Sequence, residues 1–250
     1  MKTYNVAVLG ATGAVGQKFV RLLEGHPWFR VAEVVAGEGH AGESYREGVD
    51  WIEASPLPEV AGSLPLRTVR DDLDADLCFS ALPGGKAGPV ERALAGQGYP
   101  VFTNARDLRK EADVPLVIAE VNPEHLALVD QQRRIGDGFV VANGNCTSIL
   151  LALALKPVSD RFHLESCEVV SLQAVSGAGY PGVPSLDIVD NVVPFIPGEE
   201  AKVETELPKF FGRLDGGQVV PAPIAVSATC TRVPVLDGHT LAVAGHFGEP

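Results

Sequence analysis

The feature that most constrains the fold is a glycine loop near the start of the chain. Residues 4–9 form a short apolar run, and residues 15–23 carry apolar side chains at helical spacing. Between them lies Gly10-Ala-Thr-Gly13-Ala-Val-Gly16. Glycines at a strand-to-helix turn let the backbone approach a pyrophosphate, and the helix N-terminus then offers N–H groups and a favourable dipole. The loop therefore predicts a dinucleotide site. Its GxxGxxG spacing differs from the usual GxGxxG, and a turn that merely needs small residues would read the same way.

The rest of the chain divides into two regions of different character. In the first, short apolar runs alternate with helical stretches such as 87–94, which predicts βαβ units and a mostly parallel sheet. These runs lie at 31–36, 77–82, 101–103, 116–118 and 139–142. The segment 37–67 is rich in Gly, Glu and Pro and reads as a loop or excursion. In the second region, a helix at 147–158, long strand-like runs at 168–176 and 224–235, and a charged helix at 199–211 predict an α+β domain.

Composition narrows the partners. The 250 residues hold 20 Lys and Arg against 32 Asp and Glu, a net charge of −12. This charge disfavours nucleic acid, so an acidic ligand would need a local cluster of cations. The apolar runs are too short to span a membrane. With no export signal, the four cysteines read as reduced thiols in a cytoplasmic protein, and their spacing predicts no metal site.

Cys146 follows the run at 139–142 in the sequence Asn143-Gly-Asn145-Cys146-Thr-Ser. A helix N-terminus lowers the pKa of a thiol and raises its thiolate fraction. A thiolate can attack an acyl or aldehyde carbon, so we expect Cys146 to be a covalent catalyst. Cys78 and Cys167 read instead as buried small hydrophobes, and Cys230 is ambiguous.

A nucleophile needs a base, and His239 has the most suggestive position among the six histidines. It follows a strand-like run and a glycine turn, Arg232-Val-Pro-Val-Leu-Asp-Gly238, which could present an imidazole at a cleft. Spacing alone still favours a structural or solvated histidine.

Two further segments bear on the nucleotide. Ser80-Ala-Leu-Pro-Gly-Gly85 is a second small-residue loop after an apolar run, and it could border the same ligand. After the second run the chain reads Ala36-Gly-Glu-Gly-His40. Glu38 could bind ribose hydroxyls and would repel a 2′-phosphate, so these residues favour NAD.

Seven motifs in order carry a family resemblance. They are the glycine loop, the Ser80–Gly85 loop, Pro115-Leu-Val-Ile-Ala-Glu-Val-Asn122, Asn145-Cys146-Thr-Ser, Gln173-Ala-Val-Ser-Gly-Ala-Gly179, Glu199-Glu-Ala-Lys202 and Arg232-Val-Pro-Val-Leu-Asp-Gly-His239. On these residues the whole chain resembles the aspartate-semialdehyde dehydrogenases. The resemblance implies an α/β Rossmann-type domain at 1–142 and an α+β catalytic and dimerisation domain at 143–250. It also implies a homodimer or a dimer of dimers.

The resemblance implies a reaction and a set of roles. The reaction is the reductive dephosphorylation of L-aspartyl 4-phosphate to aspartate semialdehyde through a Cys thioester, with NADPH, in lysine, threonine and methionine biosynthesis. Cys146 matches the nucleophile, His239 the acid/base and Gln173 the residue that orients the acyl intermediate. The implied substrate contacts are Arg232 for the α-carboxylate, Glu199 near the amino group, and Arg109, Asn145 and Lys202 for the phosphate. The expected cofactor contacts are Gly10, Thr12, Gly13, Ala14, Val15, Gly37, Ser80, Ala81, Leu82, Pro83, Ser176 and Gly177.

The sequence departs from the family pattern in three places. Gly37, Glu38, Gly39 and His40 stand where the family commonly has Ser and Arg for a 2′-phosphate, so NAD or dual use is open beside NADP. Leu241 stands where an acidic residue is expected soon after His239. Family chains are also longer, so we expect a second domain truncated at its C-terminal end.

Two rival functions stay open on the sequence. One is a related acyl reductase, acting on malonyl-CoA or an N-acyl-glutamyl phosphate, which would keep Cys146 and His239. The other is a truncated, non-catalytic dinucleotide-binding protein.

Overall fold

The computed structural model describes residues 2–134 and 136–248. They form two compact units. The first unit comprises the chain up to Val114 together with Val129–Asn143, and the second comprises Pro115–Leu128 and the chain from Gly144 on. The sequence predicts a single boundary at 142/143, whereas the segment Pro115–Leu128 packs with the second unit.

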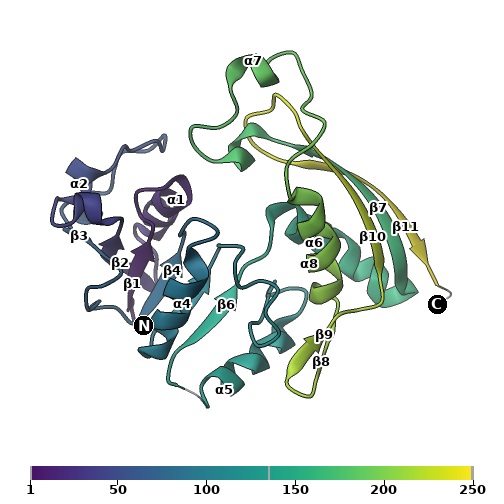
Figure 1. Ribbon diagram of the computed structural model, residues 1–250, viewed down its shortest axis with the longest axis horizontal. Coiled ribbons are helices and arrows are strands. Elements are labelled where there is room, and N and C mark those ends of the chain that lie inside the picture. Colours follow the sequence, from purple (N-terminus) through teal and green to yellow (C-terminus); the bar gives the residue numbers. More distant parts are fainter. Residues whose placement is uncertain (1, 135, 249–250) are drawn as a thin grey trace. The chain divides into compact units, whose positions relative to one another are not determined.

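The first unit is built on a parallel sheet of six strands in the order β3-β2-β1-β4-β5-β6. The strands are β1 (Tyr4–Leu9), β2 (Phe29–Val35), β3 (Leu66–Arg67), β4 (Leu77–Ser80), β5 (Pro100–Thr103) and β6 (Phe139–Ala142). The helices α1 (Ala14–Leu23), α4 (Ala87–Gly96) and α5 (Leu128–Gln132) alternate with them (Figure 1). The order reverses beside β1, as in doubly wound nucleotide-binding sheets, and confirms the predicted α/β fold.

The segment 37–67, which the sequence predicts as a loop or excursion, contains three short helices, η1 (Glu38–His40), α2 (Tyr45–Gly48) and α3 (Glu59–Gly62). It fixes the glycine loop. The hydroxyl of Tyr45 donates to the carbonyl of Ala11 at 2.7 Å, and burial raises the pKa of Tyr45. The buried Gln17 amide donates to the carbonyls of Thr12 and Asp50, both at 2.9 Å. The glycine loop is therefore held from outside as well as by its own turn.

The second unit packs helices against one face of a three-stranded sheet, β10-β7-β11. The strands are β7 (Leu164–Gln173), β10 (Ala225–Arg232) and β11 (Thr240–Phe247), with β10 parallel and β11 antiparallel to β7. Helices α6 (Cys146–Phe162) and α8 (Glu199–Phe210) contact this sheet (Figure 1). The unit also contains η2 (Pro123–Ala127), η3 (Val175–Ala178), α7 (Ser185–Ile188) and the hairpin of β8 (Arg213–Asp215) and β9 (Gln218–Val220).

Burial alternates along β7, and side chains on its open face include Val170 and Leu172, which are 43% and 37% exposed. The outer edge of β10 is protected by α8. Glu200 accepts the N–H of Cys230 and Glu204 accepts the N–H of Ala228, each at 3.2 Å. Carboxylates on this edge prevent a further strand from pairing there.

The apolar run at 116–118 belongs to no strand of the three sheets. Leu116 and Ile118 are buried in the second unit, where the side chain of Asn122 binds both of their backbones. A short apolar run predicts burial, and here the buried segment is a loop that pairs with no strand.

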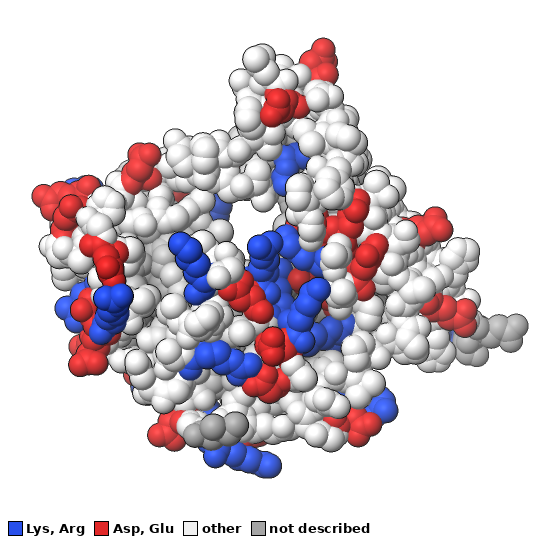
Figure 2. All heavy atoms as spheres, in the orientation of Figure 1, with Lys and Arg blue, Asp and Glu red and all other residues white. Residues whose placement is uncertain are grey.

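Acidic side chains are spread over the face shown in Figure 2, with basic side chains among them. No helix among the described residues is long and apolar enough to cross a membrane.

Candidate active site

Cys146 is the first residue of α6 and is exposed. The helix starts here because Asn145 caps it. The Oδ1 atom of Asn145 accepts the N–H groups of Thr147 at 3.0 Å and Ser148 at 3.2 Å. The backbone N–H of Asn145 donates to Glu206 Oε2 at 2.6 Å, which joins the start of α6 to α8.

His239 lies beside this cysteine, with its Nε2 atom 3.2 Å from Cys146 Sγ. The other ring nitrogen, Nδ1, accepts the backbone N–H of Ala174 at 3.1 Å. A neutral imidazole has one donor and one acceptor nitrogen, so the proton sits on Nε2 and faces the sulfur. This contact works through the backbone of Ala174, and no side-chain pattern in the sequence could have revealed it.

The expected drop in the pKa of Cys146 is wrong. Neighbouring protein removes water from around the sulfur, and the charge of Glu199 adds to this effect, so the pKa of Cys146 is raised. The N–H and hydroxyl of Thr147 act in the expected direction but are outweighed. The pKa of His239 is lowered, chiefly by burial and then by Arg232, with Glu199 opposing. Cys146 and His239 therefore rest as a thiol and a neutral imidazole around neutral pH.

Glu199 is the centre of a buried polar cluster. It accepts the side-chain amide of Asn145 and the ammonium of Lys202, the latter at 2.7 Å. Burial opposes its ionisation, but these two bonds outweigh it and lower the pKa of Glu199. The amide of Gln173 donates to Thr147 Oγ1 at 3.0 Å, which brings it to the first turn of α6. The cluster thus places Asn145, Gln173 and Lys202 around one carboxylate.

A cavity of about 380 Å³ lies next to this cluster, and its lining includes Gly177, Glu199, Lys202 and Arg232. Arg232 is 6% exposed, and its Nη1 donates to the carbonyl of Ala174 at 2.6 Å. No carboxylate of the described chain pairs with this guanidinium. The cavity therefore offers an unneutralised cation with further donors, which suits a small anionic ligand.

Gly177 allows His239 and Arg232 to lie together. A Cβ atom at this position would lie 3.0 Å from His239 Cε1 and 3.2 Å from Arg232 Nη1. Both distances are below ordinary contact, so a larger residue here would displace one of the two side chains.

In the first unit, the glycine loop has the geometry of an anion cradle. Gly10 has φ of +73°, and a Cβ there would lie 2.7 Å from the carbonyl oxygen of Ala81. Gly13 precedes α1 and provides no side-chain cap, and the first turn of α1 holds no acidic residue. The first N–H groups of α1 therefore point out of the helix uncapped by a side chain, as a pyrophosphate requires. The loop fits a dinucleotide.

The other predicted site residues divide between the units. Thr12, Ala14, Val15, Gly37, Ser80, Ala81, Leu82, Pro83 and Arg109 lie in the first unit, and Ser176 and Gly177 in the second. Arg109 is 8% exposed and donates to the carbonyl of Asn104 at 2.8 Å. The structure brings Cys146, His239, Asn145, Gln173, Glu199, Lys202 and Arg232 together within the second unit.

Glu38 has a neighbour that the sequence does not indicate. Its Oε1 atom lies 3.0 Å from Nη2 of Arg70, and both side chains are exposed. Arg70 is 32 positions away along the chain, so only the fold places a cation beside the predicted ribose-binding carboxylate.

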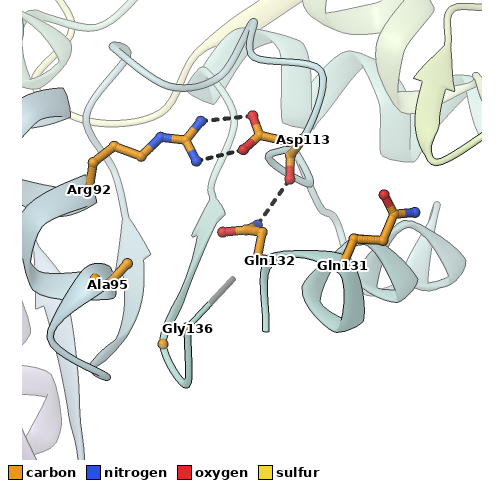
Figure 3. A pocket seen from close by; sticks show the side chains of 8 residues that line it. Arg92, Ala95, Asp113, Gln131, Gln132 and Gly136 are labelled. Atoms are coloured by element: carbon orange, nitrogen blue, oxygen red, sulfur yellow. Dashed lines mark hydrogen bonds and ion pairs between the residues drawn. The ribbon is translucent and has the colours of Figure 1, made fainter. Parts of the chain in front are cut away.

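Another cavity, of about 320 Å³, lies in the first unit, and its lining includes Arg92 and Asp113 (Figure 3). Its lining also includes Gly96, the last residue of α4, and Gly138, just before β6, whereas the glycine loop and the Ser80–Pro83 loop follow the carboxyl ends of their strands. Arg92 in this cavity is held by Asp113 through two bonds of 2.6 and 2.7 Å. With its cation already neutralised, this cavity is a poor anion site.

No group of three or more His, Cys, Asp and Glu side chains within residues 2–134 and 136–248 could hold a metal ion.

Comparisons with known proteins agree with this geometry. Residues 5–129 match the semialdehyde dehydrogenase NAD-binding domain, and residues 155–249 match the semialdehyde dehydrogenase dimerisation domain. Aspartate-semialdehyde dehydrogenase of Archaeoglobus fulgidus is 52% identical over 98% of this chain and 72% of its own length. The enzyme of Methanothermobacter thermautotrophicus is 50% identical over 96% of this chain and 70% of its own.

Solved structures give the same result. The aspartate-semialdehyde dehydrogenase of Candida albicans with NADP superposes with a TM-score of 0.92 at 35% identity, covering 100% of this chain and 73% of that one. The Vibrio cholerae aspartate-semialdehyde dehydrogenase II complexed with ASA has a TM-score of 0.78 at 28% identity, covering 100% and 76%. The chain therefore belongs to the aspartate-semialdehyde dehydrogenase family of NAD(P)-dependent oxidoreductases.

Proposed function

We propose that this chain reduces L-aspartyl 4-phosphate to L-aspartate 4-semialdehyde and inorganic phosphate, with a thioester on Cys146. The observation that carries the proposal is the 3.2 Å contact between Cys146 Sγ and His239 Nε2 at the start of α6. The cavity lined by Glu199, Lys202 and Arg232 lies in the same unit and supports a substrate with both anionic and cationic groups.

Cys146 reacts as the thiolate, the form left when its resting thiol has lost its proton to water. Its sulfur forms a bond to the acyl carbon while the carbon–oxygen bond to phosphate breaks, which leaves an aspartyl thioester and free phosphate. Reduced nicotinamide supplies a hydride when it is bound. Cleavage of the carbon–sulfur bond then releases the aldehyde and returns the thiolate.

His239 acts in this scheme as a donor at Nε2. Because Nδ1 accepts the N–H of Ala174, Nε2 carries the proton and can donate to the sulfur once the thiolate has formed. The same N–H can donate to the oxygen that becomes negative as the thioester is reduced. The lowered pKa of His239 keeps the ring neutral, which supports a hydrogen-bond donor rather than a resident imidazolium.

Substrate recognition rests on complementary charges. Arg232 would hold the α-carboxylate, since a planar guanidinium binds a carboxylate through two hydrogen bonds. Glu199, whose pKa is lowered, would face the substrate amine, and Lys202 and Arg109 would bind the phosphate. Asn145 and Gln173 would keep the first turn of α6 in register with the acyl group. The Nδ2 group of Asn145 donates to Glu199, and its Oδ1 atom caps α6. These bonds support a positioning role for Asn145 in addition to the predicted phosphate contact.

For the cofactor we propose NADP, with NAD as a second substrate. The glycine loop and the uncapped start of α1 support binding of the pyrophosphate common to both. Glu38 disfavours a 2′-phosphate, but Arg70 beside it could hold one if the Glu38–Arg70 pair opens. Pairs this exposed contribute at most about 1 kcal/mol, so opening is cheap.

We also propose that two copies of the chain form a dimer through the open face of the β10-β7-β11 sheet. Val170 and Leu172 are exposed there, and in register beside them on the flanking strands lie Ala242 and Thr231. Size-exclusion chromatography with light scattering tests this. The double variant Val170→Glu, Leu172→Glu should be monomeric, while Leu22→Glu, at an exposed position of α1, should remain dimeric.

The activity is tested by phosphate-dependent oxidation of L-aspartate semialdehyde with NADP and with NAD on the 250-residue chain. Wild type should be active, and Cys146→Ala should lose turnover while keeping its affinity for the dinucleotide. Faster turnover of an N-acyl-glutamate semialdehyde or malonate semialdehyde would favour a related acyl reductase. Dinucleotide binding without any Cys146-dependent acylation would favour a non-catalytic protein.

A further inference from the structure

Helix α4 carries a fully buried carboxyl group, Glu91, to which neither the sequence motifs nor the proposed reaction gives a role. Its Oε1 atom accepts two short hydrogen bonds, from Ser80 Oγ and Thr103 Oγ1, both at 2.6 Å. Its Oε2 atom has no hydrogen-bond partner in the part of the chain that the structure describes.

Core packing does not explain this residue. Leu94, three positions further along α4, is buried as an ordinary apolar residue of the core. Burying a carboxyl group is costly, and a half-satisfied one more so. The burial of Glu91 and the nearby charge of Asp107 raise the pKa of Glu91, against the two hydroxyl bonds. A carboxyl group at position 91 therefore lowers the stability of the fold, whereas an apolar side chain there would not.

The two hydroxyls that reach Glu91 stand at equivalent places in the sheet. Ser80 ends β4 and Thr103 ends β5, and the two residues are in register on neighbouring parallel strands. Each hydroxyl donates to Glu91 and accepts a backbone N–H two residues further on. Ala105 N donates to Thr103 Oγ1 at 2.9 Å, and Leu82 N donates to Ser80 Oγ at 3.5 Å. One carboxylate oxygen thus orders the first turn of both loops that leave these strands.

The first of these loops supports the glycine loop. The N–H of Ala81 donates to the carbonyl of Leu9 at 2.8 Å, and the carbonyl of Ala81 lies against Gly10, which leaves no room for a Cβ there. A shift of Ala81 would therefore move Gly10. The second loop leads to Arg109, which is tied back to the carbonyl of Asn104.

We propose that Glu91 is a positioning residue that fixes the loops after β4 and β5 and thereby sets the affinity of the first unit for its dinucleotide. The part of this inference that concerns affinity rests on the proposed function, because that function assigns the Ser80–Pro83 loop and the glycine loop to the nucleotide. The ordering of the loops does not depend on it.

The test compares three variants of the full chain. Glu91→Met removes the acceptor and keeps the length of the side chain. Glu91→Gln keeps a carbonyl oxygen in the place of Oε1. Leu94→Ala removes core packing from the same helix without touching either hydroxyl, and it serves as the control for lost stability.

Two readouts separate loop order from binding. Hydrogen exchange of the apo protein reports the amides of Leu82 and Ala105, and fluorescence titration gives the Kd for NADPH and for NADH. Glu91→Met should speed exchange at both amides and raise both Kd values about tenfold, the loss expected for hydrogen bonds to a carboxylate. Glu91→Gln should stay within about threefold of wild type in both. Leu94→Ala should lower the melting temperature and leave the exchange rates of both amides and both Kd values unchanged.

The proposal is overturned if Glu91→Met leaves exchange and Kd unchanged, if Leu94→Ala changes them as much, or if Glu91→Gln is as impaired as Glu91→Met. Should Glu91→Met fail to fold, Thr103→Val removes one hydroxyl at nearly constant shape. It should then speed exchange at Ala105 more than at Leu82, and equal rates at Ala105 in this variant and wild type would refute the role. If Glu91→Met exchanges faster at both amides but the wild type binds neither NADPH nor NADH, the ordering of the loops stands and the proposed function is refuted.

Discussion

Asn145 joins the first turn of α6 to Glu199, so replacing it separates two contributions to the stability of the second unit. Its Oδ1 atom caps the helix through Thr147 and Ser148, and its amide donates to the buried carboxylate of Glu199. Loss of a cap costs about 1 kcal/mol, and loss of a hydrogen bond to a charged group about 2 kcal/mol. Asn145→Ala loses both, about 3 kcal/mol in all, whereas Asn145→Ser keeps a capping oxygen and loses about 2 kcal/mol.

Urea unfolding followed by circular dichroism at 222 nm measures these losses. With a slope of about 2 kcal/mol per molar urea, the midpoint should fall by about 1.5 M for Asn145→Ala and about 1 M for Asn145→Ser. Both tryptophans, Trp28 and Trp51, lie in the first unit, so their emission is an internal control that should shift less. Equal midpoints for the two variants would show that the cap contributes nothing. A wild-type midpoint for Asn145→Ser would show the same for the bond to Glu199.

Three further predictions concern the chemistry of the site. Gly177→Ala should lower kcat at least tenfold with little change in melting temperature, because its Cβ would crowd His239, and a wild-type kcat would show that the ring has room to move. Glu199→Gln should lower the pKa of Cys146, because the substitution removes a negative charge that raises this pKa. The pH profile of alkylation by iodoacetamide should therefore shift to lower pH. An unchanged or higher midpoint of this profile would contradict the assignment. Glu38→Ala should raise the ratio of kcat/KM for NADP to that for NAD severalfold, because the carboxylate no longer repels a 2′-phosphate and Arg70 is released, whereas an unchanged ratio would place the ribose elsewhere.

Much of the fold is readable from apolar periodicity. The runs at 4–9, 77–82 and 139–142 became β1, β4 and β6, because a buried parallel strand needs apolar side chains on both faces. The same rule fails at 116–118, where burial comes from packing in a loop. Apolar periodicity also fails to predict the helices of the segment 37–67. These helices are four residues or shorter, too short for a periodic pattern, yet Tyr45 in this segment fixes the glycine loop.

The candidate site was partly readable for a similar reason. Cys146 after an Asn and before an apolar stretch predicts a helix start, and the structure has α6 begin there. What the sequence could not supply is the balance of forces around the sulfur. The helix N-terminus lowers the pKa of a thiol, but neighbouring protein that removes water from around the sulfur, together with the charge of Glu199, 53 positions away, raises it instead. The partner of His239 Nδ1 is a backbone group, and Glu91 depends on two hydroxyls from different strands. Such contacts exist only once the chain has folded.

The central claim is that Cys146 carries the acyl group. Mass spectrometry of the protein after incubation with L-aspartyl 4-phosphate, without reduced nucleotide, tests it most directly. The account predicts an aspartyl adduct on the peptide that contains Cys146, and none on those with Cys78, Cys167 or Cys230, which are buried. The adduct should disappear when NADPH is added. Turnover without an adduct on Cys146, or an adduct on another cysteine that NADPH consumes, would contradict the account.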